Sequence, residues 1–272
     1  MEISWGDALA DAYKNRKELA AFVKKGLTRL LGRKTLLAVT GMQGAGKTVL
    51  HDYLSGRAYE SDYETPMQSQ RKETGKIKGR TDDGKKQVLM TVIPGQTSEI
   101  RHSALDDVFK QNDTDGVLHV VSDGFATIRK QSSIDVLVKD QKLDTIEKLR
   151  AAHRASEVGE LKETCERIVQ CQRRCRKPSW LIVVVGKTDL YPTELQEARN
   201  YYSPTSGSQF GQVLADLQRR VGSDFIRFDE VPMACHLEGF EWNGHTTPTN
   251  LTTERRDQYV AQLLKLIMSY CS

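Results

Sequence analysis

One short segment has residue types and spacing that suit phosphate chemistry. Residues 41–48 read Gly-Met-Gln-Gly-Ala-Gly-Lys-Thr and fit the pattern G-x-x-x-x-G-K-[ST]. Glycines let a loop wrap closely around phosphates, because a Cβ would keep the backbone N–H groups from pointing inward. Those N–H groups, with the N-terminus of a following helix, present partial positive charge to the phosphates. The segment therefore predicts a phosphate-binding loop (P-loop) for a nucleoside triphosphate.

Single positions in this loop have separate expected roles. Lys47 is expected to bridge the β- and γ-phosphates and to stabilise charge during phosphoryl transfer, and the Thr48 hydroxyl to ligate Mg²⁺. The residues expected to contact the nucleotide here are Gly41, Gln43, Gly44, Ala45, Gly46, Lys47, Thr48 and Val49. Chance would produce the pattern in a chain of this length about one time in a hundred at average residue frequencies. Its position between an apolar run and a helical stretch favours a real site over chance.

The elements that would position this loop are short apolar runs that alternate with helical stretches. Strands are expected at 35–40, 76–81, 87–93, 116–122, 180–185 and 230–234, and helices at about 47–57 and 254–270. Continuous apolar strands separated by helices predict a mostly parallel sheet with helices on both faces. Asp82-Asp83-Gly84 is a hairpin turn signal and adds one antiparallel edge strand. The expected fold class is therefore α/β, with a mostly parallel six-stranded sheet.

Two helical segments lie outside this pattern. Residues 1–34 are expected to form an amphipathic helix with one basic face, which either packs on the following domain, as we favour, or binds a partner or an anionic membrane. Residues 35–272 would form the main domain. Residues 125–178, with no proline before Pro178, are expected to add a helical insert of helices near 126–139, 143–156 and 158–175. This insert is the expected accessory subdomain and a candidate docking element for a protein partner.

Downstream segments resemble, in the right order, the guanine-nucleotide motifs of the translation-factor-related class of P-loop GTPases. Val92-Ile-Pro-Gly95-Gln96 resembles D-x-x-G-Q, Gly186-Lys187-Thr188-Asp189 resembles N-K-x-D, and Met233-Ala234-Cys235 resembles the S-A-K loop. Among that class the Ras-like small GTPases look most similar. The resemblance covers about 35–122 and 180–270. It implies a Ras-like sheet, GTP or GDP with Mg²⁺ as cofactors, and slow GTP hydrolysis by a molecular switch.

The resemblance also implies roles at the base. The Asp189 carboxylate would accept two hydrogen bonds from guanine N1–H and its exocyclic amine, which adenine cannot offer. The stem of Lys187 would cover the base, and the backbone N–H of Ala234 would donate to the guanine carbonyl oxygen. Leu190 and Cys235 are expected beside them. The alternative for Asp189 is a helix cap after a strand.

At the phosphates the resemblance implies that the Gly95 N–H contacts the γ-phosphate and that Gln96 orients the attacking water. Gln96 could equally be an ordinary polar loop residue. Thr74 is the expected switch threonine and second metal ligand, with Thr65 and Thr81 as competitors. Arg101 follows this segment and is a candidate arginine finger within the same chain.

Two positions depart from the family pattern. Val92 replaces the aspartate that holds Mg²⁺ through water, and an apolar side chain cannot do this. Gly186 replaces an asparagine whose amide would bond the base and brace the P-loop. A lost hydrogen bond costs on the order of 1 kcal/mol, so weaker affinity is expected rather than a different base. Hydrolysis is the step that Val92 puts in question.

Composition limits the classes of protein to which this chain can belong. The chain has 272 residues, a net charge of +4 and five cysteines without disulfide-scaffold spacing, which predicts reduced thiols in a cytoplasmic protein. The mild charge gives no clear sign of nucleic-acid binding. No stretch approaches the length of a membrane span, and membrane contact is not expected. Three hypotheses remain: a GTPase, a nucleotide-binding scaffold without hydrolysis, and an ATP-using P-loop protein.

Overall fold

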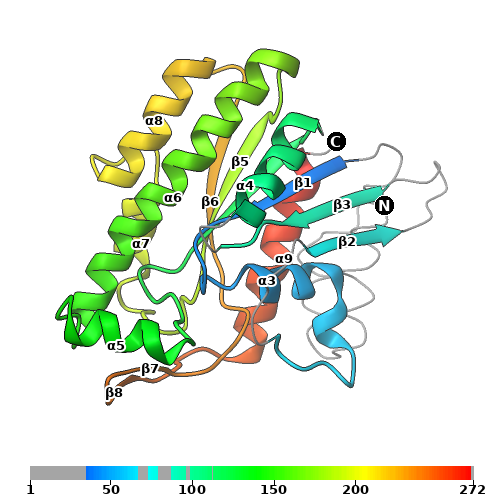
Figure 1. Cartoon of the computed structure of the whole chain (residues 1–272). Coiled ribbons are helices and arrows are strands. Elements are labelled where there is room, and N and C mark those ends of the chain that lie inside the picture. The colour runs from blue at the N-terminus through cyan, green and yellow to red at the C-terminus, as the bar shows by residue number, and fades with distance from the viewer. Residues whose placement is uncertain (1–34, 67–72, 79–86, 96–98, 112, 271–272) are drawn as a thin grey trace.

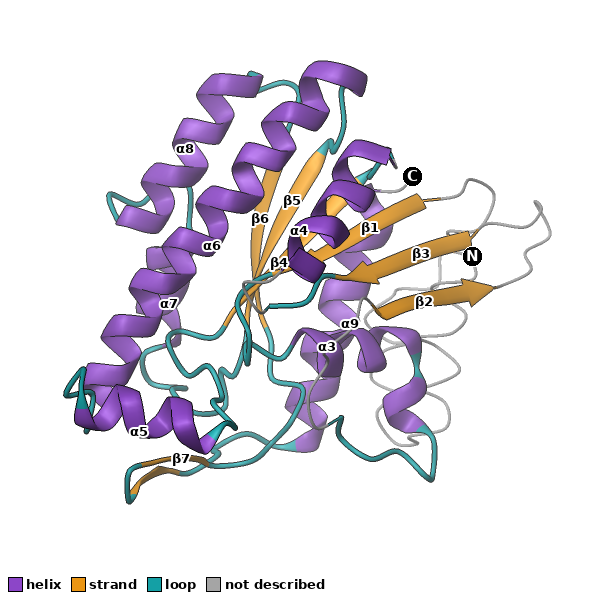
Figure 2. Cartoon of the chain, viewed as in Figure 1, coloured by secondary structure: helices purple, strands orange, loops and turns teal. Residues whose placement is uncertain are grey.

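A six-stranded sheet forms the centre of the protein. The computed structural model describes residues 35–66, 73–78, 87–95, 99–111 and 113–270. The strands are β1 (Thr35–Thr40), β2 (Glu73–Lys78), β3 (Gln87–Val92), β4 (Gly116–Val121), β5 (Trp180–Val185) and β6 (Arg227–Pro232), in the order β2-β3-β1-β4-β5-β6 (Figure 2). Strands β3, β1, β4, β5 and β6 run parallel, and β2 pairs antiparallel with β3. The predicted α/β sheet with one antiparallel edge strand is confirmed.

Helices cover both faces of the sheet (Figure 1). One face packs against α4 (Glu99–Asp106), α6 (Ile146–Cys175), α7 (Leu195–Tyr202) and α8 (Gln209–Val221). The other packs against α3 (Lys47–Ser55) and α9 (Thr253–Tyr270). In β5, Leu181 and Val183 belong to the first core and Ile182 and Val184 to the second. This alternation explains why the central strands read as continuous apolar runs.

Short elements complete the chain. A 3₁₀ turn at Arg57–Tyr59 follows α3, and a π-helical segment at Asp107–Gln111 follows α4. Helix α5 (Gln131–Lys139) precedes α6. The predicted N-terminal helix at 1–34 lies outside the described residues. In the described part of the chain, no helix combines the length and apolar character that a membrane span requires.

Two strands lie earlier in the chain than their apolar residues suggested. Strand β2 begins at Glu73 rather than 76, and β6 begins at Arg227 rather than 230. Both are edge strands. The β6 residues are exposed or half-buried, so backbone pairing with β5 rather than apolar content sets where this strand begins.

Residues 146–175 form one helix of 30 residues rather than the two expected at 143–156 and 158–175. Thr145 caps its N-terminus by accepting a hydrogen bond from the Lys148 backbone N–H. Gly159 lies in its middle, but one glycine costs a helix only about 1 kcal/mol relative to alanine. Leu161 and Ile168 are fully buried in the first core. Helix α6 is therefore part of the main sheet packing, where an accessory subdomain was expected.

A small hairpin follows β6, in a part of the chain where no strand was expected. Strands β7 (Phe240–Trp242) and β8 (His245–Thr247) pair antiparallel. Asn243 and Gly244 connect them with φ of +47° and +81°. Asn-Gly between two short strands is the residue pair that such a tight turn prefers. This hairpin borders the cavity described below.

Candidate nucleotide-binding site

A cavity of about 960 Å³ lies at the carboxyl ends of the parallel strands. Ligands of α/β proteins commonly bind at this edge. We call one part the phosphate end, lined by residues 43–50, 65–66, 92–95, Thr127, Ile128, Arg129 and Gln131. The other part is the base end, lined by Lys187, Asp189, Leu190, Cys235, His236 and residues 238–246. Motifs far apart in the sequence therefore border one cavity.

Glycines shape the P-loop for backbone reasons. Gly41, Gly44 and Gly46 have φ of +126°, +78° and +96°, which side-chain-bearing residues rarely adopt. A Cβ on Gly41 would lie 2.1 Å from the Val120 carbonyl oxygen, and one on Gly44 would lie 2.3 Å from the Thr127 carbonyl oxygen. The Thr127 N–H donates to the Gly44 carbonyl at 3.2 Å. The loop is thus held in place from β4 and from the segment that follows it.

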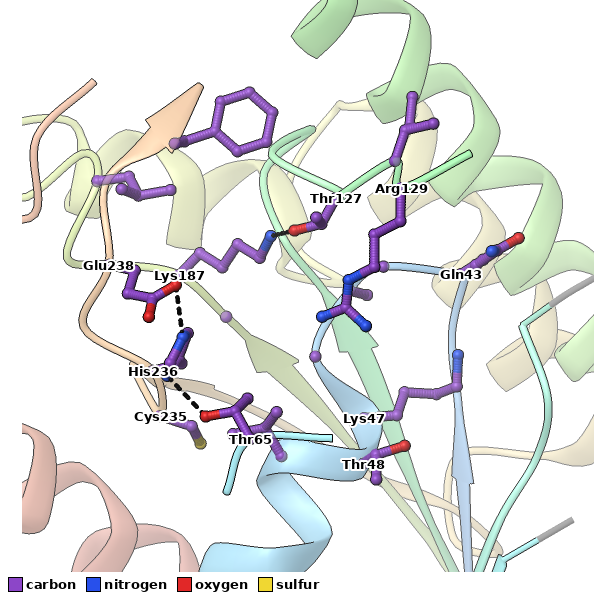
Figure 3. Close-up of a pocket in the computed structure, with 18 of the residues that line it drawn as sticks. Gln43, Lys47, Thr48, Thr65, Thr127, Arg129, Lys187, Cys235, His236 and Glu238 are labelled. Carbon is purple, nitrogen blue, oxygen red and sulfur yellow. Dashed lines mark hydrogen bonds and ion pairs between the residues drawn. The ribbon is translucent and has the colours of Figure 1, made fainter. Parts of the chain in front are cut away.

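Lys47 and Thr48 begin α3 at the phosphate end (Figure 3). The Lys47 Nζ donates to the carbonyl oxygens of Gly41 at 2.7 Å and Met42 at 2.8 Å. Its side chain is therefore folded over the loop that would surround the phosphates. Of the predicted loop contacts, Gln43, Gly44, Ala45, Gly46, Lys47, Thr48 and Val49 line the cavity, and Gly41 lies buried beneath them.

Gly95 lies directly against this loop. A Cβ on Gly95 would be 2.3 Å from the Gln43 backbone nitrogen and 2.6 Å from the Lys47 Nζ. Its backbone therefore borders the position predicted for the γ-phosphate. Gln96, the predicted water-orienting residue, lies outside the described residues. Thr74 lies within β2, where its backbone pairs with Thr91, while its competitor Thr65 lines the phosphate end.

Asp189 is the most informative residue of the base end. It is 1% exposed, and neither carboxylate oxygen has a hydrogen-bond partner in the described part of the chain. Burial raises the pKa of this carboxyl, while the nearby Thr249 hydroxyl, which does not reach hydrogen-bond geometry, and the Lys187 charge act in the opposite direction. A buried carboxylate without donors is costly. A ligand that brings two N–H donors would satisfy it.

Lys187 lies between the two ends of the cavity. Its Nζ donates to the Phe125 carbonyl at 2.5 Å and to the Thr127 hydroxyl at 2.6 Å. Burial lowers its pKa to about 8, although the nearby Asp189 charge opposes this shift. Because Thr127 also bonds Gly44, the Lys187 ammonium is linked to the P-loop through one residue.

The remaining base-end predictions divide into two groups. Leu190 and Cys235 line the cavity, whereas Ala234 is fully buried behind it. The Thr188 hydroxyl donates to the Met233 carbonyl at 3.2 Å, so the two loops that would hold the base are joined. Burial raises the pKa of the Cys235 thiol to about 12.

The structure shows what surrounds Val92 and Gly186, the two positions that depart from the family pattern. Val92 is 2% exposed, packs in the core beneath α3 and also borders the cavity. A Cβ on Gly186 would lie 2.9 Å from the Val121 carbonyl oxygen, so this backbone leaves little room for an asparagine. Lys187, Thr127 and Gly44 form a chain of hydrogen bonds between the loop after β5 and the P-loop.

Arg101 does not line the cavity, contrary to the arginine-finger expectation. It is 1% exposed and donates to the Pro94 carbonyl at 3.1 Å and to Glu163 at 2.9 Å, with a further ion pair to Glu160. Two carboxylates on α6 hold this guanidinium inside the protein. Arg101 thus anchors the backbone next to Gly95.

The sequence motifs did not predict three other residues that line the cavity, which are Arg129, His236 and Glu238. Arg129 donates through Nη1 to the Pro66 carbonyl at 3.3 Å. His236 has Nδ1 at 3.4 Å from the Thr65 hydroxyl and Nε2 at 2.7 Å from Glu238. These contacts hold residues 65–66 at the cavity, and Figure 3 shows Thr65 beside His236. They depend on long-range packing, so only the structure reveals them.

A buried charge cluster positions the loop that carries Thr127 and Arg129. Asp123, with φ of +51° and no exposure, pairs with Arg150 and Arg154 of α6. Glu157 accepts hydrogen bonds from the Ser122 backbone N–H at 2.8 Å and the Tyr202 hydroxyl at 2.6 Å. Helix α6 therefore fixes residues 122–129 relative to the cavity.

No known protein-family model matches the sequence, and no curated protein matches it. Among solved structures, the chain is similar to an ADP-ribosylation factor-like GTP-binding protein, the small COPII coat GTPase Sar1 from Encephalitozoon cuniculi, in complex with GDP. The two are 14% identical with a TM-score of 0.46, over 96% of this chain and 91% of that chain. We draw no functional conclusion from a similarity of this size.

Proposed function

We propose that this protein binds a guanine nucleotide in the cavity, with the phosphates in the P-loop and the base at Asp189. The observation that carries this proposal is the pairing of two features at opposite ends of one cavity. Lys47 and the glycine-shaped loop offer positive charge and N–H donors at the phosphate end. Asp189 offers two buried oxygens that have no hydrogen-bond partner among the described residues at the base end.

The carboxylate favours guanine over adenine for a chemical reason. Guanine presents N1–H and an exocyclic amine side by side, so it can donate to both oxygens of Asp189. Adenine has no such pair of donors. Adenine bound here would leave the carboxylate buried and unsatisfied, which is how sites with buried polar groups reject the wrong ligand. If ATP protects the protein from thermal unfolding as well as GTP does, the ATP-using alternative replaces this proposal.

The activity that we propose is slow hydrolysis of GTP by a molecular switch. Lys47 and the loop amides would stabilise the developing charge, and Gly95 would meet the γ-phosphate through its backbone. Incubation of the pure protein with labelled GTP, alone and with a candidate partner, tests this. Measurable phosphate release supports hydrolysis, and its absence in both cases excludes it.

Val92 favours a second candidate, in which the nucleotide is held without turnover. Of the protein ligands expected for Mg²⁺, the Thr48 hydroxyl borders the cavity, but the aspartate position is occupied by a buried valine. The nucleotide that co-purifies with the protein separates the two candidates. Intact GTP indicates a non-hydrolysing scaffold, and GDP indicates hydrolysis.

Two further predictions concern a protein partner and the location of the protein in the cell. A partner would bind near residues 65–110, which border the phosphate end, or on the helical segment at 125–178. The cytoplasmic location stays a prediction from the sequence.

A further inference from the structure

The phosphate end has an unusual balance of charge. Among the described residues that line it, Lys47 and Arg129 are the charged ones, and neither Asp nor Glu is present. Glu99 begins α4, is exposed and does not line the cavity. Among the described residues, this end of the cavity therefore presents cations without a lining carboxylate.

Such a lining is a poor match for Mg²⁺. This ion prefers oxygen ligands and is usually held by one or two carboxylates together with the phosphates. Here Thr48 supplies a hydroxyl, but Val92 supplies no charge and no ligand atom. A divalent cation would also be repelled by the Arg129 guanidinium, which lines this end of the cavity.

Arg129 can supply the charge that the metal would bring. A divalent cation offset by one carboxylate adds one net positive charge beside the phosphates, and one guanidinium adds the same. The Arg129 side chain turns back over the P-loop rather than away from it (Figure 3). Its Nη1 already donates to the Pro66 carbonyl, and four other N–H donors of the guanidinium suit phosphate oxygens.

We propose that Arg129, together with Lys47, neutralises the phosphates of the bound nucleotide, so that binding does not require Mg²⁺. This inference rests on the proposed function, because it concerns the same nucleotide in the same cavity. It assigns a phosphate-binding role to a residue outside all the sequence motifs. The loop of residues 122–129, fixed by Asp123 and α6, holds Arg129 in place.

Titration of a fluorescent GTP analogue in excess EDTA and in excess Mg²⁺ tests this inference. Wild-type affinity is expected to differ by less than about threefold between the two conditions. Arg129→Gln is expected to weaken binding in EDTA by about tenfold or more, because a charge-assisted contact to phosphate is lost. Arg129→Lys keeps the charge but not the planar set of donors. Its affinity in EDTA is expected to lie between those of the wild type and Arg129→Gln.

Lys130→Gln is the matched control. Lys130 is the adjacent exposed cation and does not line the cavity, so its loss should leave binding within about twofold. Because Arg129 is exposed, its variants are expected to keep the wild-type melting temperature without nucleotide.

Two results would overturn the inference while leaving the proposed function intact. One is wild-type binding that is weaker in EDTA than in Mg²⁺ by about threefold or more. The other is an Arg129→Gln protein that binds as well as Lys130→Gln. Glu73, whose backbone pairs with Val92, would be the replacement carboxylate if Glu73→Gln abolished such an Mg²⁺ dependence. Absence of binding in both conditions would instead refute the proposed function itself.

Discussion

At the scale of single residues, the protein carries a buried charge that nothing in its described part satisfies. Asp189 follows β5, and its carboxylate is enclosed by the cavity wall with neither oxygen hydrogen-bonded. Burial of this kind costs free energy in the nucleotide-free protein. Functional sites commonly hold groups that are unfavourable until the ligand arrives. Asp189 therefore indicates which ligand the cavity recognises.

Asp189→Asn is expected to weaken GTP binding by about a hundredfold, because one donor of guanine would then face an amide N–H₂. The same change should raise the melting temperature of the nucleotide-free protein, since a neutral amide costs less to bury than a carboxylate. Competition of GTP and ATP, with melting curves, measures both effects. Glu197→Gln, at an exposed carboxylate of α7 that does not line the cavity, is the control. An Asn variant that keeps full guanine preference would contradict base recognition by Asp189.

The sequence predicted the motif residues of this site but not their neighbours. Lys47, Thr48, Gly95, Lys187 and Asp189 have types and spacing tied to nucleotide chemistry, and they border one cavity. Arg129 and His236 have no such signature. Arg101 looked suitable only because it lies near Gly95 in the sequence, and Glu160 and Glu163 from α6 hold it elsewhere. Distances between elements decide such roles.

At the scale of elements, two loops must approach each other closely for the phosphate end to form. The backbone at Gly95 leaves no room for a side chain beside Gln43 and Lys47. Helix α6 fixes these loops through Arg101 on one side and Asp123 on the other. The long helix is therefore a support for the cavity as well as a cover for the sheet.

Gly95→Ala is expected to lower nucleotide affinity by at least about tenfold, because the added methyl group displaces the loop from Lys47. The matched substitution is Gly159→Ala, at an exposed position of α6 with nothing within 4 Å of the new Cβ. It should raise the free energy of unfolding by about 1 kcal/mol and leave binding unchanged. Nucleotide titration and urea unfolding of both variants check this. Equal affinity in the two variants would show that Gly95 does not shape the site.

The sequence predicted whether a segment forms a helix or a strand better than it predicted where that element begins and ends. The apolar strands β1, β4 and β5 lie within a residue of their expected ranges because burial on both faces gives an unambiguous pattern. The edge strands β2 and β6 were misplaced because backbone pairing fixes them. The Asn243-Gly244 turn was overlooked although it is a strong signal. Helix α6 was divided in error at residue 157, two residues before its one glycine.

At the scale of the whole molecule, a histidine in the central sheet makes the stability of the fold depend on pH. His119 in β4 is fully buried, with Nδ1 at 2.9 Å from the Thr40 hydroxyl and no described partner for Nε2. Burial lowers its pKa from 6.5 to about 3, and the charges of Arg101 and Lys47 add to this. The folded protein therefore keeps this side chain neutral.

The free energy of unfolding should fall as the pH drops from about 6.5 toward 3, because the unfolded chain binds a proton that folded His119 refuses. This contribution is complete above the unfolded pKa and decreases by up to about 1.4 kcal/mol per pH unit below it. Burial also lowers the pKa of His153. This histidine therefore also contributes to the fall in the free energy of unfolding at low pH. His119→Leu should reduce the slope relative to the wild type by one proton. Identical slopes in urea unfolding at several pH values would contradict this account.

Direct calorimetric titration of GTP and ATP into the wild-type protein and Lys47→Ala tests the central claim most directly. Wild type is expected to bind GTP at least about tenfold more tightly than ATP, and Lys47→Ala is expected to lose most of its affinity for both. The account is contradicted if wild type binds neither triphosphate, or if the Lys47 variant binds GTP as tightly as wild type does.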